Sequence, residues 1–314
     1  MPEPSSVRRS GDRRGDPRRY QIAVLSILAL YGLLALDLEI RAEIAGVLLA
    51  CVLGFQCLFG RWLGLAFDWR SPLISGLSLC LLLRTTSLAV AVLAAFVTIA
   101  GKFLVRRRGK HVFNPSALAL VVVVLFFDDA WVSPGQWGSV ALFGFLAAGL
   151  GMLVVYRAAR SDVSLAFLAA WGAVVFGRAL WLGDPPAIPL HQISSGALLL
   201  FAFFMISDPK TTPDSRAGRI LFAGLVALGA GAVQFGLYRA NGPLYALVAV
   251  SLLVPLIDRA LPGGAYSWHR PGRPSPQRAA AVPAVPARPV PLRPTLAPVP
   301  PAAAVAGRGR SGRR

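Results

Sequence analysis

The sequence predicts an all-α fold: a polytopic membrane protein of about ten transmembrane helices, in two inverted five-helix repeats with short broken helices. The first observation is composition, because 55% of the 314 residues are hydrophobic and only 15% are charged, whereas soluble domains average about 25% charged residues. Long apolar runs between residues 20 and 261 are the second observation, and basic residues in alternate loops are the third. Together they indicate helices that face lipid rather than an oversized soluble core.

Ten apolar segments can be placed in order along the chain. The first five are expected near residues 20–36, 42–60, 72–83, 86–104 and 113–127. The second five are expected near residues 138–156, 163–182, 189–206, 218–238 and 242–258. A helix that crosses the bilayer needs about 20 residues. The third segment is about half a span and the eighth is also short, so each is predicted to be a broken helix.

The segments define three regions of the chain. Residues 1–19 form a basic N-terminus, and residues 20–261 form the membrane domain, with repeat one at 20–127 and repeat two at 138–258. Residues 262–314 are rich in Pro, Ala and Arg and lack apolar periodicity. Such a composition cannot bury a core, so this tail is expected to be disordered.

Basic residues predict the orientation of the chain. If the N-terminus is cytoplasmic, the cytoplasmic segments before the tail carry 18 Lys and Arg residues. The opposite side carries Arg41, Arg84, Arg178 and Arg239. This asymmetry follows the positive-inside rule, and it predicts that both termini are cytoplasmic.

The net charge of +18 does not predict nucleic-acid binding, because arginines crowd the termini and short loops without an aromatic-interleaved basic face. Nucleic acid is therefore not an expected partner. The three cysteines lie inside apolar runs and form no Cys/His cluster, so no metal site is expected.

Two stretches of the chain are similar in sequence. Residues 74–79 read ISGLSL and residues 194–199 read SSGALL, and each lies in the third segment of its five-segment half. Because five is odd, the second half would enter the membrane from the opposite side. Inverted repeats with short broken helices in matching positions point to a site near the membrane midplane. Chance remains the alternative, since runs of small residues and Leu are common in membrane helices.

Several motifs carry a resemblance to a known family. In the first half these are SPLISG at 71–76, the pair Gly101-Lys102, and GKHVFNPS at 109–116. In the second half they are FFMISDPKTT at 203–212, the pair Gly218-Arg219, and LVPLID at 253–258. In this order, over about residues 20–260, the chain resembles the RnfD/NqrB family, whose members are membrane subunits of the Rnf complex and of the Na⁺-translocating NADH:quinone reductase.

The resemblance implies a membrane subunit of an electron-transport complex that couples flavin-mediated electron transfer to ion translocation. It also implies a place in the bacterial cytoplasmic (inner) membrane, with lipid and other membrane electron-transfer subunits as partners. The chain would then be the membrane component of an ion-translocating oxidoreductase, although no catalytic residue can be named from the sequence.

Relatives in this family carry FMN on a threonine within a Ser/Thr-Gly-Ala-Thr sequence. The nearest match here, Ser195-Gly196-Ala197-Leu198, has Leu at the acceptor position and is expected to begin the eighth helix instead. We therefore expect no covalent FMN, and any flavin, FMN or riboflavin, is expected to be bound non-covalently.

Candidate site residues gather around two prolines, Pro115 after Asn114 and Pro209 after Asp208. Proline removes a backbone N–H and disfavours helix before it, which frees carbonyl groups that must be satisfied by protein or line a polar cavity. The predicted cofactor-binding residues are Lys102, His111, Asn114, Ser207 and Asp208. The predicted ion pathway consists of Arg84, Thr85, Thr86 and Asp208. The alternative is ordinary turn chemistry at the membrane interface, with Lys102 as a plain topology determinant.

Two other functions remain open at this point. The same inverted-repeat scaffold could form a non-redox ion or small-solute channel or transporter, and the missing flavin threonine favours this alternative. The FNP and SDP motifs favour the electron-transfer function. A third candidate function is that of a scaffold subunit for another membrane enzyme, which no sequence feature would reveal.

Overall fold

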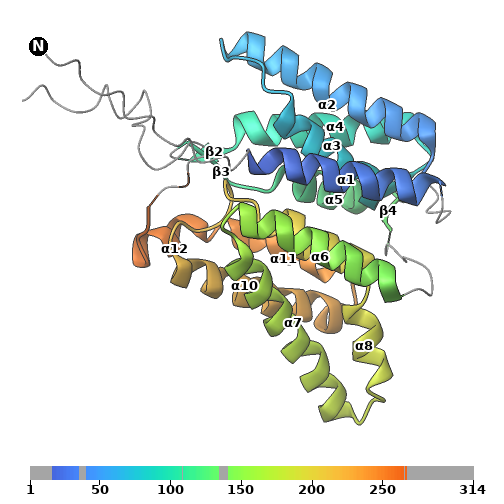
Figure 1. Ribbon diagram of the computed structural model, residues 1–314, viewed down its shortest axis with the longest axis vertical. Helices are drawn as coiled ribbons and strands as arrows, with labels where there is room; N and C mark the ends of the chain where they lie inside the picture. The colour runs from blue at the N-terminus through green and yellow to red at the C-terminus, as the bar shows by residue number, and fades with distance from the viewer. Residues whose placement is uncertain (1–15, 35–39, 108, 134–140, 265, 267–314) are drawn as a thin grey trace, which may run out of the picture. The chain divides into compact units, whose positions relative to one another are not determined.

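The computed structural model describes residues 16–34, 40–107, 109–133, 141–264 and 266, with the backbone alone for residues 141–147. Most of the predicted basic N-terminus and of the predicted tail therefore lie outside the described residues. The described part is mostly helical (Figure 1).

Five helices make up the first half, and each lies within a few residues of a predicted segment. They are α1 (Pro17–Leu34), α2 (Ala42–Trp62), α3 (Arg70–Leu82), α4 (Leu88–Leu104) and α5 (Pro115–Phe126). Side chains fix two of the starts: the Ser87 hydroxyl accepts a hydrogen bond from the Val90 N–H, and Asn114 caps α5 immediately before Pro115. These are the residue types preferred at such positions, because they satisfy N–H groups that have no partner within the helix.

The second half contains more breaks, and most of its helices are shorter than those of the first half. Its helices are α6 (Ala141–Arg157), α7 (Ser161–Leu182), α8 (Ala187–Ile193), α9 (Gly196–Leu200), α10 (Arg216–Gly231), α11 (Gly242–Ser251) and α12 (Val254–Ala260). Two π-helical turns, η1 (Phe201–Met205) and η2 (Ala232–Gly236), extend α9 and α10.

Two predicted segments are bent pairs of helices. The eighth bends by 47° between α8 and η1, where Ser195 caps α9 by accepting a hydrogen bond from the Leu198 N–H. The tenth bends by 57° between α11 and α12. The sequence did not predict a break in the segment at 242–258, and Pro255 in the first turn of α12 accounts for it, since proline cannot continue the hydrogen-bond ladder.

The all-α prediction also misses four short strands. β1 (Leu83–Thr85) pairs antiparallel with β4 (Ala130–Val132), and β2 (Arg106–Arg107) pairs antiparallel with β3 (Lys110–His111). Each strand pair lies where short helices stop. Backbone groups freed at such points must find partners, and a strand ladder supplies them.

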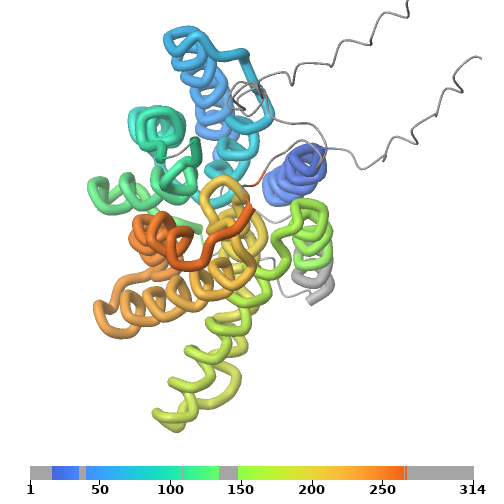
Figure 2. The backbone as a smooth tube through the Cα atoms, turned by 90° about the vertical axis from the view of Figure 1, so that its left-hand side faces the viewer, coloured from blue at the N-terminus to red at the C-terminus, as the bar shows by residue number. Residues whose placement is uncertain are grey.

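Helix packing assembles each half around its own buried residues. In the first half α2 packs against α4, α1 against α3, and α4 against α5; in the second half α7 and α11 both pack on α10. Contacts of α1 with α6 and of α5 with α11 join the halves. Figures 1 and 2 show α1–α5 gathered on one side and α6–α12 on the other.

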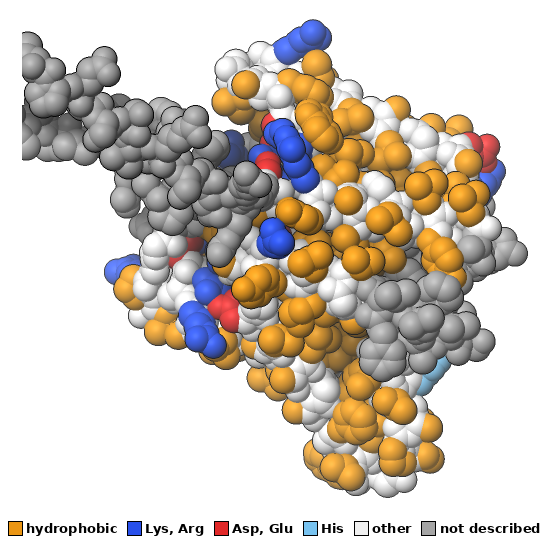
Figure 3. All heavy atoms as spheres, viewed as in Figure 1, with side chains coloured by type: hydrophobic (Ala, Val, Ile, Leu, Met, Phe, Trp, Pro, Cys, Tyr) orange, Lys and Arg blue, Asp and Glu red, His pale blue; other side chains and the backbone are white. Residues whose placement is uncertain are grey.

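Three described helices, at 42–62, 161–182 and 216–236, are long and apolar enough to cross a membrane, and up to five spans result if each bent pair counts as one. Large apolar side chains face outward on them, such as Leu180 and Trp181, which are 83% and 88% exposed. Figure 3 shows hydrophobic side chains covering much of the visible face, with several Lys and Arg side chains gathered toward one side of it. A soluble surface of this kind would aggregate. The chain is a multi-pass membrane protein.

Candidate functional site

The described residues enclose a cavity of about 270 Å³ between the two halves. Helices α1–α5 line it from the first half, and α6, η1 and residues 207–210 line it from the second. This volume is close to the lower limit of ligand pockets, about 300 Å³. The cavity wall combines aromatic rings with hydroxyl, amide and charged groups.

Asn114 joins two loops, one from each half, at this cavity. Its Oδ1 accepts a hydrogen bond from the Ala117 N–H at 3.0 Å and so starts α5. Its Nδ2 donates to the Met205 carbonyl oxygen at 3.1 Å, at the end of η1. One buried amide therefore satisfies a helix start in the first half and a helix end in the second.

Ser207 and Asp208 continue from η1 into the cavity wall. The Ser207 hydroxyl donates to the Phe203 carbonyl oxygen at 2.5 Å. Asp208 Oδ1 accepts a hydrogen bond from the Lys210 backbone N–H at 2.9 Å, so the carboxylate shapes the turn as well as lining the cavity. Burial raises the pKa of Asp208, while the hydrogen bond from the Lys210 N–H acts in the opposite direction.

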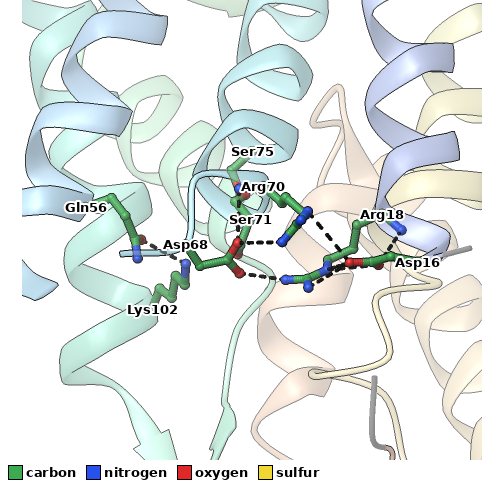
Figure 4. A network of polar contacts seen from close by, with 8 residues as sticks. All are labelled: Asp16, Arg18, Gln56, Asp68, Arg70, Ser71, Ser75 and Lys102. Carbon is green, nitrogen blue, oxygen red and sulfur yellow. Dashed lines mark hydrogen bonds and ion pairs between the residues drawn. The ribbon is translucent and has the colours of Figure 1, made fainter. Parts of the chain in front are cut away.

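Lys102 enters the cavity from α4 and is only 8% exposed. Its Nζ donates to Gln56 Oε1 at 2.9 Å, and Figure 4 shows the two side chains pointing toward each other. In the described part of the chain no carboxylate lies within ion-pair distance of Lys102. A buried ammonium beside a neutral amide leaves net positive charge in the cavity wall.

An ion-pair network closes one side of the cavity. Arg18 lies 2.8 Å from Asp16 and 2.6 Å from Asp68, and Arg70 lies 3.8 Å from Asp16 and 3.9 Å from Asp68. Figure 4 shows these four side chains linking the start of α1 to the loop before α3. The two arginines and the two aspartates of this network neutralise one another, so they add no net charge to the cavity wall. The positive charge described above comes from Lys102.

His111 lines the cavity from β3. Its Nδ1 is buried and has no hydrogen-bond partner among the described residues. Burial, assisted by the positive charges of Lys102, Arg106 and Lys210, lowers the pKa of His111 from 6.5 to about 3. The imidazole is therefore neutral near pH 7.

The structure brings together all five predicted cofactor-binding residues, which are Lys102, His111, Asn114, Ser207 and Asp208. Their role as ligands stays a prediction. Sequence reasoning did not single out Gln56 or Asp68. Gln56 could have been found, because a polar side chain in the middle of an apolar membrane segment is costly and needs an explanation.

The structure separates the other predicted residues from this cavity. Arg84 and Thr85 line a second, much smaller pocket at the far end of α3, and Thr86 is exposed and lines neither pocket. The Arg84 guanidinium donates to the carbonyl oxygens of Cys80, Leu81 and Leu83 at 3.0–3.2 Å. Residues 84–86 and Asp208 therefore do not line one cavity, and a shared ion pathway through them stays a prediction.

Comparison with known proteins gives several relatives named as the D subunit of an ion-translocating oxidoreductase complex. The relative from Pseudomonas paraeruginosa is 28% identical over 276 residues, which cover 68% of this chain and 79% of the relative. Proteins of the same name from Stutzerimonas stutzeri and Erwinia tasmaniensis are 34% and 32% identical, over 45% and 44% of this chain. The matched parts span only 40% and 38% of those two relatives' lengths.

A family profile described as NQR2, RnfD, RnfE matches residues 127–266. This range includes η1 and the Asp208 loop of the cavity. The range also includes the motifs at 203–212, 218–219 and 253–258. Over these residues the chain is similar to the NQR2, RnfD, RnfE family, and it is similar to the D subunits of ion-translocating oxidoreductase complexes named above.

Proposed function

We propose that the chain is the membrane subunit of an Rnf-like complex that couples flavin-mediated electron transfer to ion translocation. The names of the relatives support the complex, and the cavity between the halves supports a bound cofactor. Other electron-transfer subunits and the surrounding lipid are its partners, and the bacterial inner membrane is its location. The observation that carries the proposal is that Asn114 and Asp208, from the two family motifs, meet at one cavity.

The residues present fit a flavin held without a covalent bond. Phe203 and Phe204 offer apolar contact area in the cavity wall. The polar edge of a flavin ring needs hydrogen-bond partners. The Nδ1 of His111, which has no partner among the described residues, and the Ser207 hydroxyl belong to residues that line the same cavity. Lys102 supplies positive charge next to them. When bound, a flavin supplies the capacity to accept and pass on electrons, and the chain's residues bind and orient it.

We further propose that the membrane domain is a ten-span inverted repeat. Its support is the position of two irregular segments. In the first half α3 is short, and in the second half the α8–η1 segment is broken. Residues of both segments line the cavity between the halves. Half-helices that meet at a repeat interface are typical of membrane proteins with a site near the midplane.

We propose that the ion path reaches the cavity at Asp208. It is a half-buried carboxylate whose pKa is raised by burial, and such groups in membrane proteins mark ion and proton routes. Arg84, Thr85 and Thr86 are also predicted to belong to the ion pathway. They lie at the opposite end of α3 and would act there.

The second candidate is a non-redox transporter on the same scaffold. The observation that favours it is the local structure at Ser195, whose hydroxyl caps α9 in the stretch that is the nearest match to the relatives' flavin-threonine sequence. Leu198 occupies the acceptor position. This stretch therefore serves helix capping, and the two candidates differ only in whether the cavity takes a flavin.

The visible absorption spectrum of the purified full chain, before and after denaturation, separates the two candidates. We expect flavin absorbance in the native protein, or after incubation with FMN and riboflavin, and its complete release into the filtrate on denaturation. Fluorescence that stays with the denatured chain in a gel would show covalent flavin. A folded protein that takes up neither flavin would favour the transporter.

A further inference from the structure

We propose that the Arg84 guanidinium is a tethered cation that occupies the carbonyl end of α3 and closes this end of the membrane domain to inorganic cations such as Na⁺. The inference rests on the proposed function, to which it adds the role of one residue of the predicted ion pathway. That role is to exclude inorganic cations from the end of α3.

The helix α3 ends inside the protein. It runs from Arg70 to Leu82, and its 13 residues rise only about 20 Å, whereas a membrane-spanning helix needs about 20 residues. Residues 79–83 at its end are at most 4% exposed. The last carbonyl oxygens of a helix have no partner within it and carry the negative end of the helix dipole. The end of α3 is therefore a buried place of negative potential.

The Arg84 guanidinium occupies these carbonyl oxygens. Its Nη1 donates to the carbonyl oxygens of Cys80 at 3.1 Å and Leu83 at 3.0 Å, and its Nη2 donates to that of Leu81 at 3.2 Å. Arg84 is only 4% exposed. In transporters with inverted repeats, the C-terminal ends of broken helices coordinate the transported cation. Here a side chain supplies the positive charge that such a cation would bring.

The space beside the guanidinium does not admit an additional hydrated ion. The pocket that Arg84 and Thr85 line has a volume of about 10 Å³, which is no more than one water molecule needs. Apolar side chains, among them Ile44 and Leu48, line much of the rest. The β1–β4 pairing fixes the backbone on both sides of Arg84. An inorganic cation therefore reaches the carbonyl oxygens only if the guanidinium is removed.

Arg41 lines the same pocket and provides a matched control. In the described part of the chain its guanidinium pairs with the carboxylate of Glu43, and its side chain is 49% exposed. The substitution Arg41→Ala removes the same charge from the same pocket but leaves the end of α3 occupied by Arg84.

The first measurement is the thermal unfolding of the full-length chain in neutral detergent, in NaCl or in choline chloride at equal concentration. We expect Na⁺ to raise the midpoint of Arg84→Ala by about 3 °C, because a cation that binds the vacated carbonyl oxygens stabilises the folded state. Low concentrations of guanidinium should act in the same way. The wild type and Arg41→Ala should have the same midpoint in both salts.

The second measurement is the leakage of Na⁺ from proteoliposomes that contain the chain alone. Arg84→Ala should leak about tenfold faster than the wild type, since removal of a fixed positive charge lowers the barrier to a cation. Arg41→Ala should be as tight as the wild type. Arg84→Lys should also be tight, because it retains a tethered charge.

A folded Arg84→Ala variant that does not respond to Na⁺ or guanidinium would overturn the inference, and so would leakage equal to that of Arg41→Ala. If Arg84→Ala does not fold, the variants Arg84→Lys and Arg84→Met decide, because their side chains are similar in length and differ in charge. The inference requires Arg84→Lys to be the more stable in sodium-free buffer, and equal stability would overturn it. Neither measurement involves a flavin, so these failures would leave the proposed function standing. Failure of the chain to bind a flavin would contradict the proposed function and leave the role of Arg84 intact.

Discussion

Arg84 illustrates how a single charged side chain is accommodated in an apolar setting. α3 ends at Leu82, and the helix end exposes carbonyl oxygens that lack partners. The Arg84 guanidinium donates to three carbonyl oxygens at this end, and the Ser133 N–H donates to the carbonyl oxygen of Leu82. A positive charge at a helix C-terminus is favourable, because the helix dipole is negative there. The residue therefore stabilises the point where the short helix stops.

His111 makes a testable contribution to the pH dependence of stability. Its pKa is about 3 in the folded protein and 6.5 ordinarily, so the unfolded chain binds the extra proton in the window between these values. Stability is then lost as the pH falls from about 6.5 toward 3. We expect the thermal midpoint of His111→Gln to fall less than that of the wild type between about pH 7.5 and pH 5. The matched control is His191→Gln, since His191 is exposed, and an identical pH profile in all three proteins would contradict the assignment.

The site could be predicted only where sequence motifs marked it. Asn114 and Asp208 stand next to prolines, and this local chemistry predicted that both would lie at helix ends beside a polar cavity. Gln56 and Asp68 reach the same cavity through the packing of α2 and the loop after it. Gln56 can be recognised in the sequence as a polar residue in an apolar segment. The cavity that it lines depends on which helices are neighbours, and the local sequence does not encode this.

At the scale of elements, α6 shapes the cavity through one glycine. A Cβ atom added at Gly151 would lie 2.6 Å from Cγ of Phe203, whose ring belongs to η1 and lines the cavity. Backbone and ring can be this close only because Gly151 has no side chain. A Cβ atom at Gly149, in the same helix, would meet nothing within 4 Å.

These two glycines give a matched pair of variants. We expect Gly151→Ala to destabilise the protein by about 1–3 kcal/mol through overpacking and to weaken flavin binding by displacing Phe203. Gly149→Ala should be neutral or stabilising by up to about 1 kcal/mol, since alanine favours helix. Thermal unfolding and flavin titration of both variants provide the measurement. If the two variants had the same thermal stability and the same flavin affinity, Gly151 would not be in close contact with η1.

Most helices were predictable from the sequence, while the irregular elements were not. Length and apolarity located α2, α4 and α7 within a few residues, because a membrane helix satisfies its backbone internally whatever its neighbours are. The β1–β4 pairing joins Leu83 to Val132, which lie far apart in the sequence. No local pattern predicts it, since each strand has only three residues and its partner is set by the tertiary fold.

At the scale of the whole described unit, the two halves are held together at a few polar points. The Asn114 amide reaches the carbonyl oxygen of Met205, and Lys110 reaches the carbonyl oxygen of Thr212 at 3.1 Å as well as the carboxylates of Asp214 and Asp258. All of these contacts run from the loop between α4 and α5 to the second half. The loop that closes the cavity is thus also the one that ties the halves together.

The last prediction concerns the orientation of the chain in the membrane. Arg106 and Lys210 line the cavity, and both belong to loops that the charge asymmetry of 18 basic residues against four assigns to the cytoplasm. We therefore expect a fluorescent protein fused after Pro262 to be fluorescent. Alkaline phosphatase inserted within residues 128–138 should be active, and inserted at Gly109 it should be inactive. The Gly109 insertion is the control, because an even number of spans must separate it from the C-terminus. An active phosphatase after Pro262 would mean that one span has been miscounted.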